Sequence, residues 1–264
     1  MRKFVFTVAL SGAILALGCG GGSEESAKST SGTPTDQPVV MASGDYTAVD
    51  VTNGGTIKGR VTFAGDVPKL QKLEVTKDVN VCGKTAHYKE DVLVSTDKGL
   101  ANVVVSIANI DKGKAMSALG ESFELDQNGC AFTPHVTLVP AGAVLTIFNS
   151  DGILHNIHTY SEANSPINKA QPGFKKKMTA KFSEPEIIRL ACDVHNWMTG
   201  YIAVVDHPYH VVTDENGRFE LSGVPAGTYT VEYWQETLGQ KSMEVTVSEG
   251  ADTDGSIEYT MGSN

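Results

Sequence analysis

Cysteine, positive charge and long apolar runs are all scarce in this sequence of 264 residues. Four cysteines are too few for a small domain held together by disulfides, so the fold needs an apolar core, and a hydrophobic content of 41% can supply one. The 21 Lys and Arg residues face 31 Asp and Glu, which gives a formal net charge of -10 at pH 7. Because nucleic-acid binding depends on clustered cationic side chains, this balance argues against a nucleic-acid partner.

The N-terminus carries an uncharged run that follows Arg2 and Lys3. This run is too short to cross a bilayer, and its basic start, apolar middle and small-residue end are typical of an export signal over residues 1–18. The segment resembles bacterial lipoprotein signals, which implies that Cys19 is lipidated; ordinary secretion is the alternative. We therefore expect an exported chain, in the periplasm or at the cell surface, attached to a membrane by a lipid anchor.

The next segment, residues 19–52, is rich in Gly, Ser, Thr and Pro, and this composition predicts a flexible tether. From residue 56 onward the sequence predicts short β-strands, because β-branched runs with alternating apolar and polar positions are separated by Gly, Asp, Asn and Pro. The predicted strands are 56–63, 101–110, 135–140, 143–149, 186–192, 200–205, 217–224, 227–234 and 242–248. This pattern predicts an all-β fold made of sandwiches or barrels.

One loop between two predicted strands holds a thiol, an imidazole and a thioether: Cys192, His195 and Met198. Two histidines and a cysteine with a weak axial methionine define a blue-copper site, and His155, after an earlier predicted strand, supplies the second histidine. Zinc is the nearest alternative, because it also binds thiolate and imidazole, but methionine is a poor zinc ligand.

Residues 122–206 resemble a cupredoxin. The resemblance rests on VTLVPAGAVLTIFNSDGILHN and on the later FSEPEIIRLACDVHNWMTGYIAVV, in which the Cys-x2-His-x2-Met spacing is that of the short amicyanin-type loop. It implies a Greek-key β-sandwich with one type 1 copper centre. His155, Cys192 and His195 would be the strong ligands, Met198 the axial ligand, and Asn156 the residue whose hydrogen bonds tie the first ligand to the Cys loop.

The same resemblance implies that electrons pass through the exposed edge of His195, with Trp197 and Ile153 close by in sequence. Two further histidines are candidates for additional metal contacts. His158 lies three residues after His155, so on a strand it faces the other way, and it is either a hydrogen-bonded surface residue or a further ligand. His135 has the same two interpretations.

With Cys19 assigned to lipid and Cys192 to copper, Cys82 and Cys130 remain. In an exported chain we expect them to form a disulfide, and two buried free thiols are the alternative.

The flanks resemble a second family. Residues 213–234 are similar to the end of carboxypeptidase regulatory-like, transthyretin-type β-sandwiches, and residues 56–68 and 99–107 look like the opening strands of such a domain. Two layouts are compatible with this resemblance. Either residues 53–121 and 207–264 form one discontinuous sandwich interrupted by the cupredoxin, or 53–121 is a loose extension before a separate C-terminal sandwich.

These features predict one-electron transfer between redox proteins, such as a c-type cytochrome and a periplasmic dehydrogenase, and no enzymatic activity. Copper storage, delivery or sensing at the cell surface is the alternative from another class, and a structural β-sandwich lipoprotein is the third.

Overall fold

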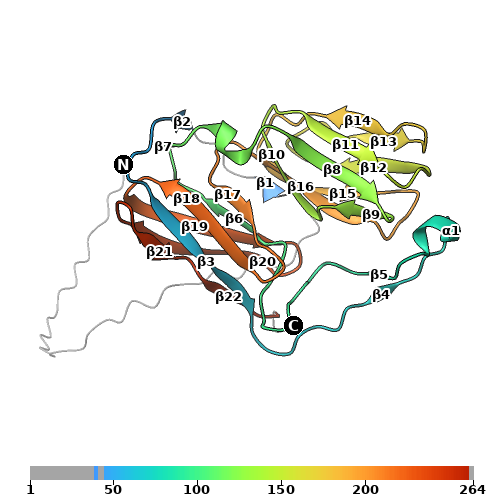
Figure 1. Cartoon of the computed structure of the whole chain (residues 1–264), viewed down its shortest axis with the longest axis horizontal. Coiled ribbons are helices and arrows are strands. Elements are labelled where there is room, and N and C mark those ends of the chain that lie inside the picture. The colour runs from blue at the N-terminus through green and yellow to red at the C-terminus, as the bar shows by residue number, and fades with distance from the viewer. Residues whose placement is uncertain (1–38, 41–44, 262–264) are drawn as a thin grey trace, which may run out of the picture.

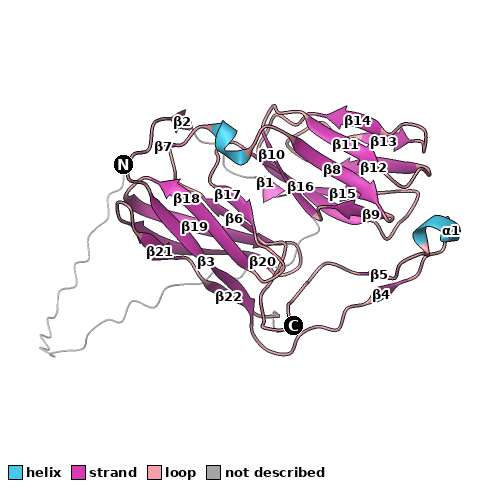
Figure 2. Cartoon of the chain, in the orientation of Figure 1, coloured by secondary structure: helices cyan, strands magenta, loops and turns pink. Residues whose placement is uncertain are grey.

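The computed structural model describes residues 39–40 and 45–261, and the regular secondary structure of this part of the chain is almost all β-strand (Figure 2). The expected signal peptide, Cys19 and most of the expected tether lie outside the described residues. The structure confirms the all-β sandwich fold class. No helix within the described ranges is long and apolar enough to cross a membrane.

The first sandwich consists of two sheets with the strand orders β10-β16-β15-β12-β13 and β14-β11-β8-β9. Their apolar residues form one core, which includes Ile147, Ile188 and Ile202 and also contains Cys192. The strands are β8 (Phe123–Asn128), β9 (Ala131–Thr133), β10 (Val136–Pro140), β11 (Leu145–Asn149), β12 (His155–Tyr160), β13 (Asn168–Gln171), β14 (Lys177–Ala180), β15 (Glu186–Ala191) and β16 (Thr199–Val205).

The second sandwich takes strands from both sides of the first in sequence (Figure 1). Its sheets have the orders β17-β6-β19-β20 and β18-β3-β21, and β22 also pairs with β3. These sheets therefore combine strands from residues 55–107 with strands from residues 210–259. The strands are β3 (Gly55–Phe63), β6 (Val104–Ile107), β17 (His210–Val212), β18 (Arg218–Val224), β19 (Gly227–Gln235), β20 (Gly239–Val247), β21 (Asp252–Asp254) and β22 (Ile257–Tyr259).

Parts of the segment expected to be a tether are paired in strands. β1 (Val39–Val40) pairs with β15, and β2 (Thr47–Ala48) pairs with β7 (Lys112–Gly113). Consecutive β-branched valines favour an extended backbone, which the Gly- and Ser-rich composition around them obscures. A 3-10 helix, η1 (Met116–Leu119), follows β7.

A long excursion, residues 64–93, leaves the second sandwich after β3 and reaches the first sandwich beside β9 (Figure 1). We call it the strap. It contains only three short elements: β4 (Lys72–Leu73), α1 (Val79–Cys82) and β5 (His87–Tyr88), with β4 and β5 paired to each other.

The two sandwiches pack on each other through an apolar cluster. Val136, Tyr201 and Ala203 of the first sandwich pack in it with Val104 of the second, and Trp234 packs against it. The Tyr201 and Trp234 rings meet edge to face with centroids 5.0 Å apart. Strand β16 is consequently buried at six consecutive positions, because one of its faces lies in the first core and the other lies against the second sandwich.

His135 joins three parts of the structure at the edge of this interface. Its imidazole contacts Glu236 of the second sandwich (2.5 Å) and Glu90 of the strap (3.3 Å), and it is nearly buried. Burial alone would lower the pKa of His135, but the hydrogen bonds to Glu236 and Glu90 outweigh it and raise the pKa to about 9. His135 therefore forms an ion pair that links the two sandwiches and the strap.

The raised pKa predicts a pH-dependent stability. A group with a raised folded pKa stabilises fully below its unfolded pKa, about 6.5, and this contribution is lost as pH rises through about 9, with a slope of up to about 1.4 kcal/mol per pH unit. We expect the free energy of unfolding to fall in this window in the wild type and to stay flatter in His135→Gln and Glu236→Gln. Denaturant titrations from pH 6 to 10 measure the free energy of unfolding. The prediction would be contradicted if this free energy changed with pH in the same way in the wild type and in His135→Gln.

Glu186 is a fully buried carboxylate at the start of β15. It accepts hydrogen bonds from the Ser161 hydroxyl, the Asn164 side chain and the backbone N–H groups of residues 162–164. Burial raises the pKa of this carboxyl, but the hydrogen bonds outweigh it and hold the pKa below its ordinary value. The carboxylate thus fixes the loop after β12 to the strand that leads to Cys192.

Replacing Glu186 by Gln leaves several of these buried donors without an acceptor. We expect Glu186→Gln to lower the free energy of unfolding at pH 7 by about 1–3 kcal/mol. Because the folded pKa of Glu186 is depressed, its stabilisation is present above pH 4.5 and is lost as pH falls below that value. The free energies of unfolding of the wild type and of Glu186→Gln should therefore converge in acid. The exposed neighbour Glu184→Gln is the matched control, and an equal loss in both variants would contradict the role of Glu186.

Candidate metal centre

Three of the predicted ligands come together at one end of the first sandwich. His155 opens β12, where it pairs with Gln171 of β13, and Cys192 follows the last residue of β15. The loop from Cys192 closes on itself, since the Cys192 N–H donates to the Met198 carbonyl (3.2 Å) and the Met198 N–H donates to the His195 carbonyl (2.9 Å). Strand ends and one tight turn therefore fix the positions of these side chains.

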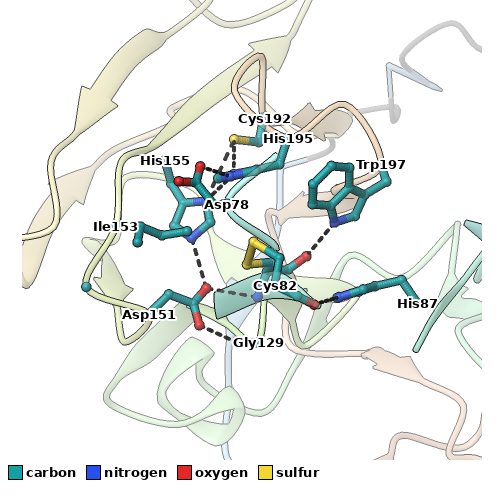
Figure 3. The surroundings of a disulfide bond; sticks show 12 residues. Asp78, Cys82, His87, Gly129, Asp151, Ile153, His155, Cys192, His195 and Trp197 are labelled. Carbon is teal, nitrogen blue, oxygen red and sulfur yellow. Dashed lines mark hydrogen bonds and ion pairs between the residues drawn. A yellow bond between two sulfur atoms is a disulfide. The ribbon is translucent and has the colours of Figure 1, made fainter. Parts of the chain in front are cut away.

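The donor atoms form a compact triangle (Figure 3). The Cys192 Sγ lies 3.9 Å from the Nδ1 atoms of both His155 and His195, and the two Nδ1 atoms are 3.0 Å apart. Metal–nitrogen and metal–sulfur bonds of about 2.0 and 2.3 Å place donors in a trigonal set roughly 3.4–3.7 Å apart. All three side chains are buried, at 0–1% exposure, so the residues present fit a metal ion.

Met198 lies in the same loop as Cys192 and His195 and is buried, at 1% exposure. Its backbone contacts with Cys192 and His195 bring the residue to the site, and its side chain belongs to the apolar core that also contains Cys192. A methionine in the ligand loop favours copper over zinc among the metals that bind thiolate and imidazole.

The donors influence one another's protonation. Burial alone would lower the pKa of His155, but hydrogen bonds to Asp151 and to the Cys192 sulfur outweigh it and raise the pKa to about 9. Burial raises the pKa of the Cys192 thiol, and the contacts with His155 and with backbone N–H groups outweigh it and lower the pKa. Burial lowers the pKa of His195 despite its contact with Asp78. Without a metal, the charged His155 and a neutral His195 flank the sulfur.

The Nε2 atom of His155 is held by a carboxylate. Asp151 Oδ2 lies 2.9 Å from it, and the same carboxylate accepts the backbone N–H groups of Gly129 (2.6 Å) and Cys130 (2.8 Å) (Figure 3). Both donors lie in the β8–β9 turn, where φ is +63° at Gly129 and +57° at Cys130, so that their N–H groups point the same way. Cys130 is bonded to Cys82 of the strap, which is the disulfide expected from the sequence.

The Nε2 atom of His195 is held in the same manner by the strap. Asp78 Oδ2 lies 2.9 Å from it, and His195 has 0% exposure. The expectation that this edge of His195 is exposed is therefore wrong, because the strap covers it. Sequence reasoning missed Asp78, since 117 positions separate it from His195 and nothing in its local pattern distinguishes it from other surface aspartates.

Asn156 connects the first ligand to the Cys loop. Its side-chain oxygen accepts the N–H groups of Asp193 (2.6 Å) and Val194 (3.3 Å), and its amide donates to Asp193 and Asn168. Such contacts orient a ligand loop and influence the thiolate beside it. The adjacent His158 contacts Asp193 Oδ1 (2.8 Å) and stacks on Tyr160, on the opposite side of β12 from His155.

Buried amides fix the loop before His155. The Asn149 amide donates to the carbonyls of Ile153 (2.8 Å) and Gln171 (3.0 Å), and Gln127 donates to the Gln171 side chain (2.7 Å). These residues come from both sheets of the sandwich, so the loop that carries Asp151 and leads to His155 is tied to each of them.

Among the described residues, two groups place three possible metal donors together. One is the set of His155, Cys192 and His195. The other combines Cys130, Asp151 and His155, but the Cys130 sulfur is already in the disulfide and is not free to bind a metal. His158 and His135 belong to neither group, so the structure does not bring them to a second metal site.

Comparisons with known proteins match parts of the chain. The family model for polysaccharide lyase family 4, domain II, matches residues 183–255, well under half of the chain. This family differs from the carboxypeptidase regulatory-like domains that residues 213–234 resemble, and that assignment stays a prediction. No curated protein matches the sequence.

Several solved structures of copper proteins are similar to about a third of this chain. The Cu-containing nitrite reductase from Thermus scotoductus SA-01 is 20% identical with a TM-score of 0.31; the match covers 33% of this chain and 23% of the reductase. A purple cupredoxin from Nitrosopumilus maritimus is 18% identical with a TM-score of 0.27, over 32% of this chain and 100% of that chain. A mutant of amicyanin in the Cu(I) state is 16% identical with a TM-score of 0.29, and the match covers 38% of this chain and 98% of the amicyanin chain.

The charged His155 predicts that metal binding releases protons. Its Nδ1 lone pair must be free to bind a metal, so at pH 7 copper should displace about one proton from His155, and this release should decline as pH rises past about 9. Calorimetric titrations with Cu(II) in buffers of different ionisation enthalpy measure the number. Asp151→Asn removes the contact that raises the pKa and should reduce the release at pH 7. Release that does not change between pH 7 and 10 would contradict the prediction.

Proposed function

We propose that this chain is an exported, lipid-anchored type 1 copper protein that carries single electrons between partner proteins. The observation that carries the proposal is the buried triangle of two imidazole nitrogens and one cysteine sulfur, with Met198 in the same short loop. This donor set suits copper in both of its biological oxidation states.

The arrangement of the site favours electron transfer over ligand exchange. Strand ends hold His155 and Cys192, a hydrogen-bonded turn holds His195 and Met198, and carboxylates hold the far nitrogens of both imidazoles. Copper supplies the one-electron redox chemistry when bound. The residues keep the donors in place and exclude water, so little has to rearrange when the oxidation state changes.

The partners and location follow as proposals from charge and from the N-terminal pattern. The chain has a net charge of -10, so a basic redox partner such as a c-type cytochrome would be attracted, and salt should weaken the encounter. A periplasmic dehydrogenase is a further candidate partner. Lipidation at Cys19 would hold the protein at a membrane surface.

Loading the purified protein with Cu(II) tests the proposal. We expect an intense visible absorption from the copper–thiolate bond and a reversible one-electron wave in voltammetry. Cys192→Ser should abolish the absorption, whereas His158→Gln, on the other side of β12, should retain it. A copper site at Cys192 would be contradicted if Cys192→Ser kept the absorption, or if the wild type took up no copper.

The same experiment separates electron transfer from copper storage or delivery. A storage or delivery protein gives up its metal, so its copper should pass readily to a competing chelator. The buried donors and their fixed outer hydrogen bonds predict slow exchange and a stable redox wave instead. Fast copper loss from a colourless protein would favour delivery over electron transfer.

A further inference from the structure

The strap covers the side of the metal centre where the sequence leads us to expect an open edge. Asp78 of the strap contacts the Nε2 atom of His195, and the imidazole is completely buried. A partner protein cannot touch this nitrogen while the strap is in place. The chain itself therefore occupies the position at which a redox partner would approach His195.

Asp78 is placed for this contact and not for the helix it precedes. It occupies the N-cap position of α1 with φ +48° and ψ +40°, and its side chain makes no capping hydrogen bond. The left-handed region is an unfavourable backbone conformation for a non-glycine residue. Because the Asp78 carboxylate does not cap the helix, it is available to contact His195.

The strap is held at its middle by contacts near the disulfide. Cys82 is bonded to Cys130, and His87 Nε2 contacts the Cys82 carbonyl at 2.8 Å. The His87 and Trp197 ring centroids are 6.0 Å apart, and the Trp197 indole donates to the Cys130 carbonyl. Most residues of the strap are exposed, Leu70 and Val79 among them, and the strap packs on the first core through a small apolar set, Val75, Val81 and Cys82.

We infer that Asp78 is a positioning residue for His195, and that the disulfide-held strap closes this edge of the copper site to protein partners until a dithiol reduces Cys82–Cys130. The closed edge is inferred from the geometry of the strap alone. Its effect on redox partners rests on the proposed copper function. In the reduction, the dithiol gives two electrons and two protons to the disulfide. Cys82 and Cys130 become thiols, and the dithiol becomes a cyclic disulfide.

The metal-free protein tests closure without any copper chemistry. Diethyl pyrocarbonate acylates accessible imidazole nitrogens, and peptide mass spectrometry gives the rate at His195. We expect slow acylation in the oxidised wild type and at least a tenfold faster rate after reduction with a dithiol, in Cys82→Ser/Cys130→Ser, and in Asp78→Asn. Asp66→Asn, an exposed aspartate at the start of the strap, is the matched control and should behave as the wild type.

Two results overturn closure by the strap. Fast acylation of His195 in the oxidised wild type means that the edge is open, and equally slow acylation after reduction means that the disulfide does not hold the strap. Using the dithiol on the wild type keeps the test valid should the double Ser variant fail to fold. Because no metal is present, these outcomes do not depend on the proposed function.

The copper-loaded protein tests the positioning role. The Asp78 carboxylate favours the more positively charged oxidised site, so Asp78→Asn should raise the reduction potential and Asp78→Glu should restore it in part. An unchanged potential in Asp78→Asn overturns the positioning role. Failure to bind copper at all, with the acylation pattern intact, overturns the proposed function and leaves the closed strap standing.

Discussion

The Asp151 carboxylate is the contact through which the separate parts of the metal centre support one another. It accepts two N–H groups from the β8–β9 turn and contacts the far nitrogen of His155. The same turn holds the disulfide to the strap, and the strap brings Asp78 to His195. Both imidazoles are thus oriented from outside by carboxylates that share one anchoring point, and the donor triangle is fixed before any metal arrives.

The sheet that carries the Cys loop is restrained on both of its faces. Strands β15 and β16 contribute Ile188 and Ile202 to the first core, while Tyr201 and Ala203 pack against the second sandwich. The second sandwich therefore packs against the face of this sheet that lies opposite the first core, whereas the candidate metal donors all come from the first sandwich. His135 adds a charged contact among the first sandwich, the second sandwich and the strap at the rim of this interface.

Local sequence patterns predicted many of the strands and the candidate donors that the structure brings together, because both are local signals. Alternating β-branched runs identified the long strands, and the spacing of Cys192, His195 and Met198 identified the loop that the structure closes by hydrogen bonds. The short strands β9, β13 and β14 carry too few residues for a period to be read. The position of Asp78 could not be predicted, because it depends on how a weakly structured excursion crosses the molecule and not on its neighbours in sequence.

The discontinuous sandwich also sets an order for assembly. All strands of the first sandwich from β8 to β16, and every donor of the metal centre, have been synthesised by residue 205, whereas the strands that pair with β3 are the later β18, β21 and β22. Pairings between such distant segments form late, since a long loop must close first. The first sandwich can thus complete its own core while β3 still lacks its C-terminal partners, and Val212 and Trp234, which pack against the ligand-bearing sheet, are made after every donor of the site.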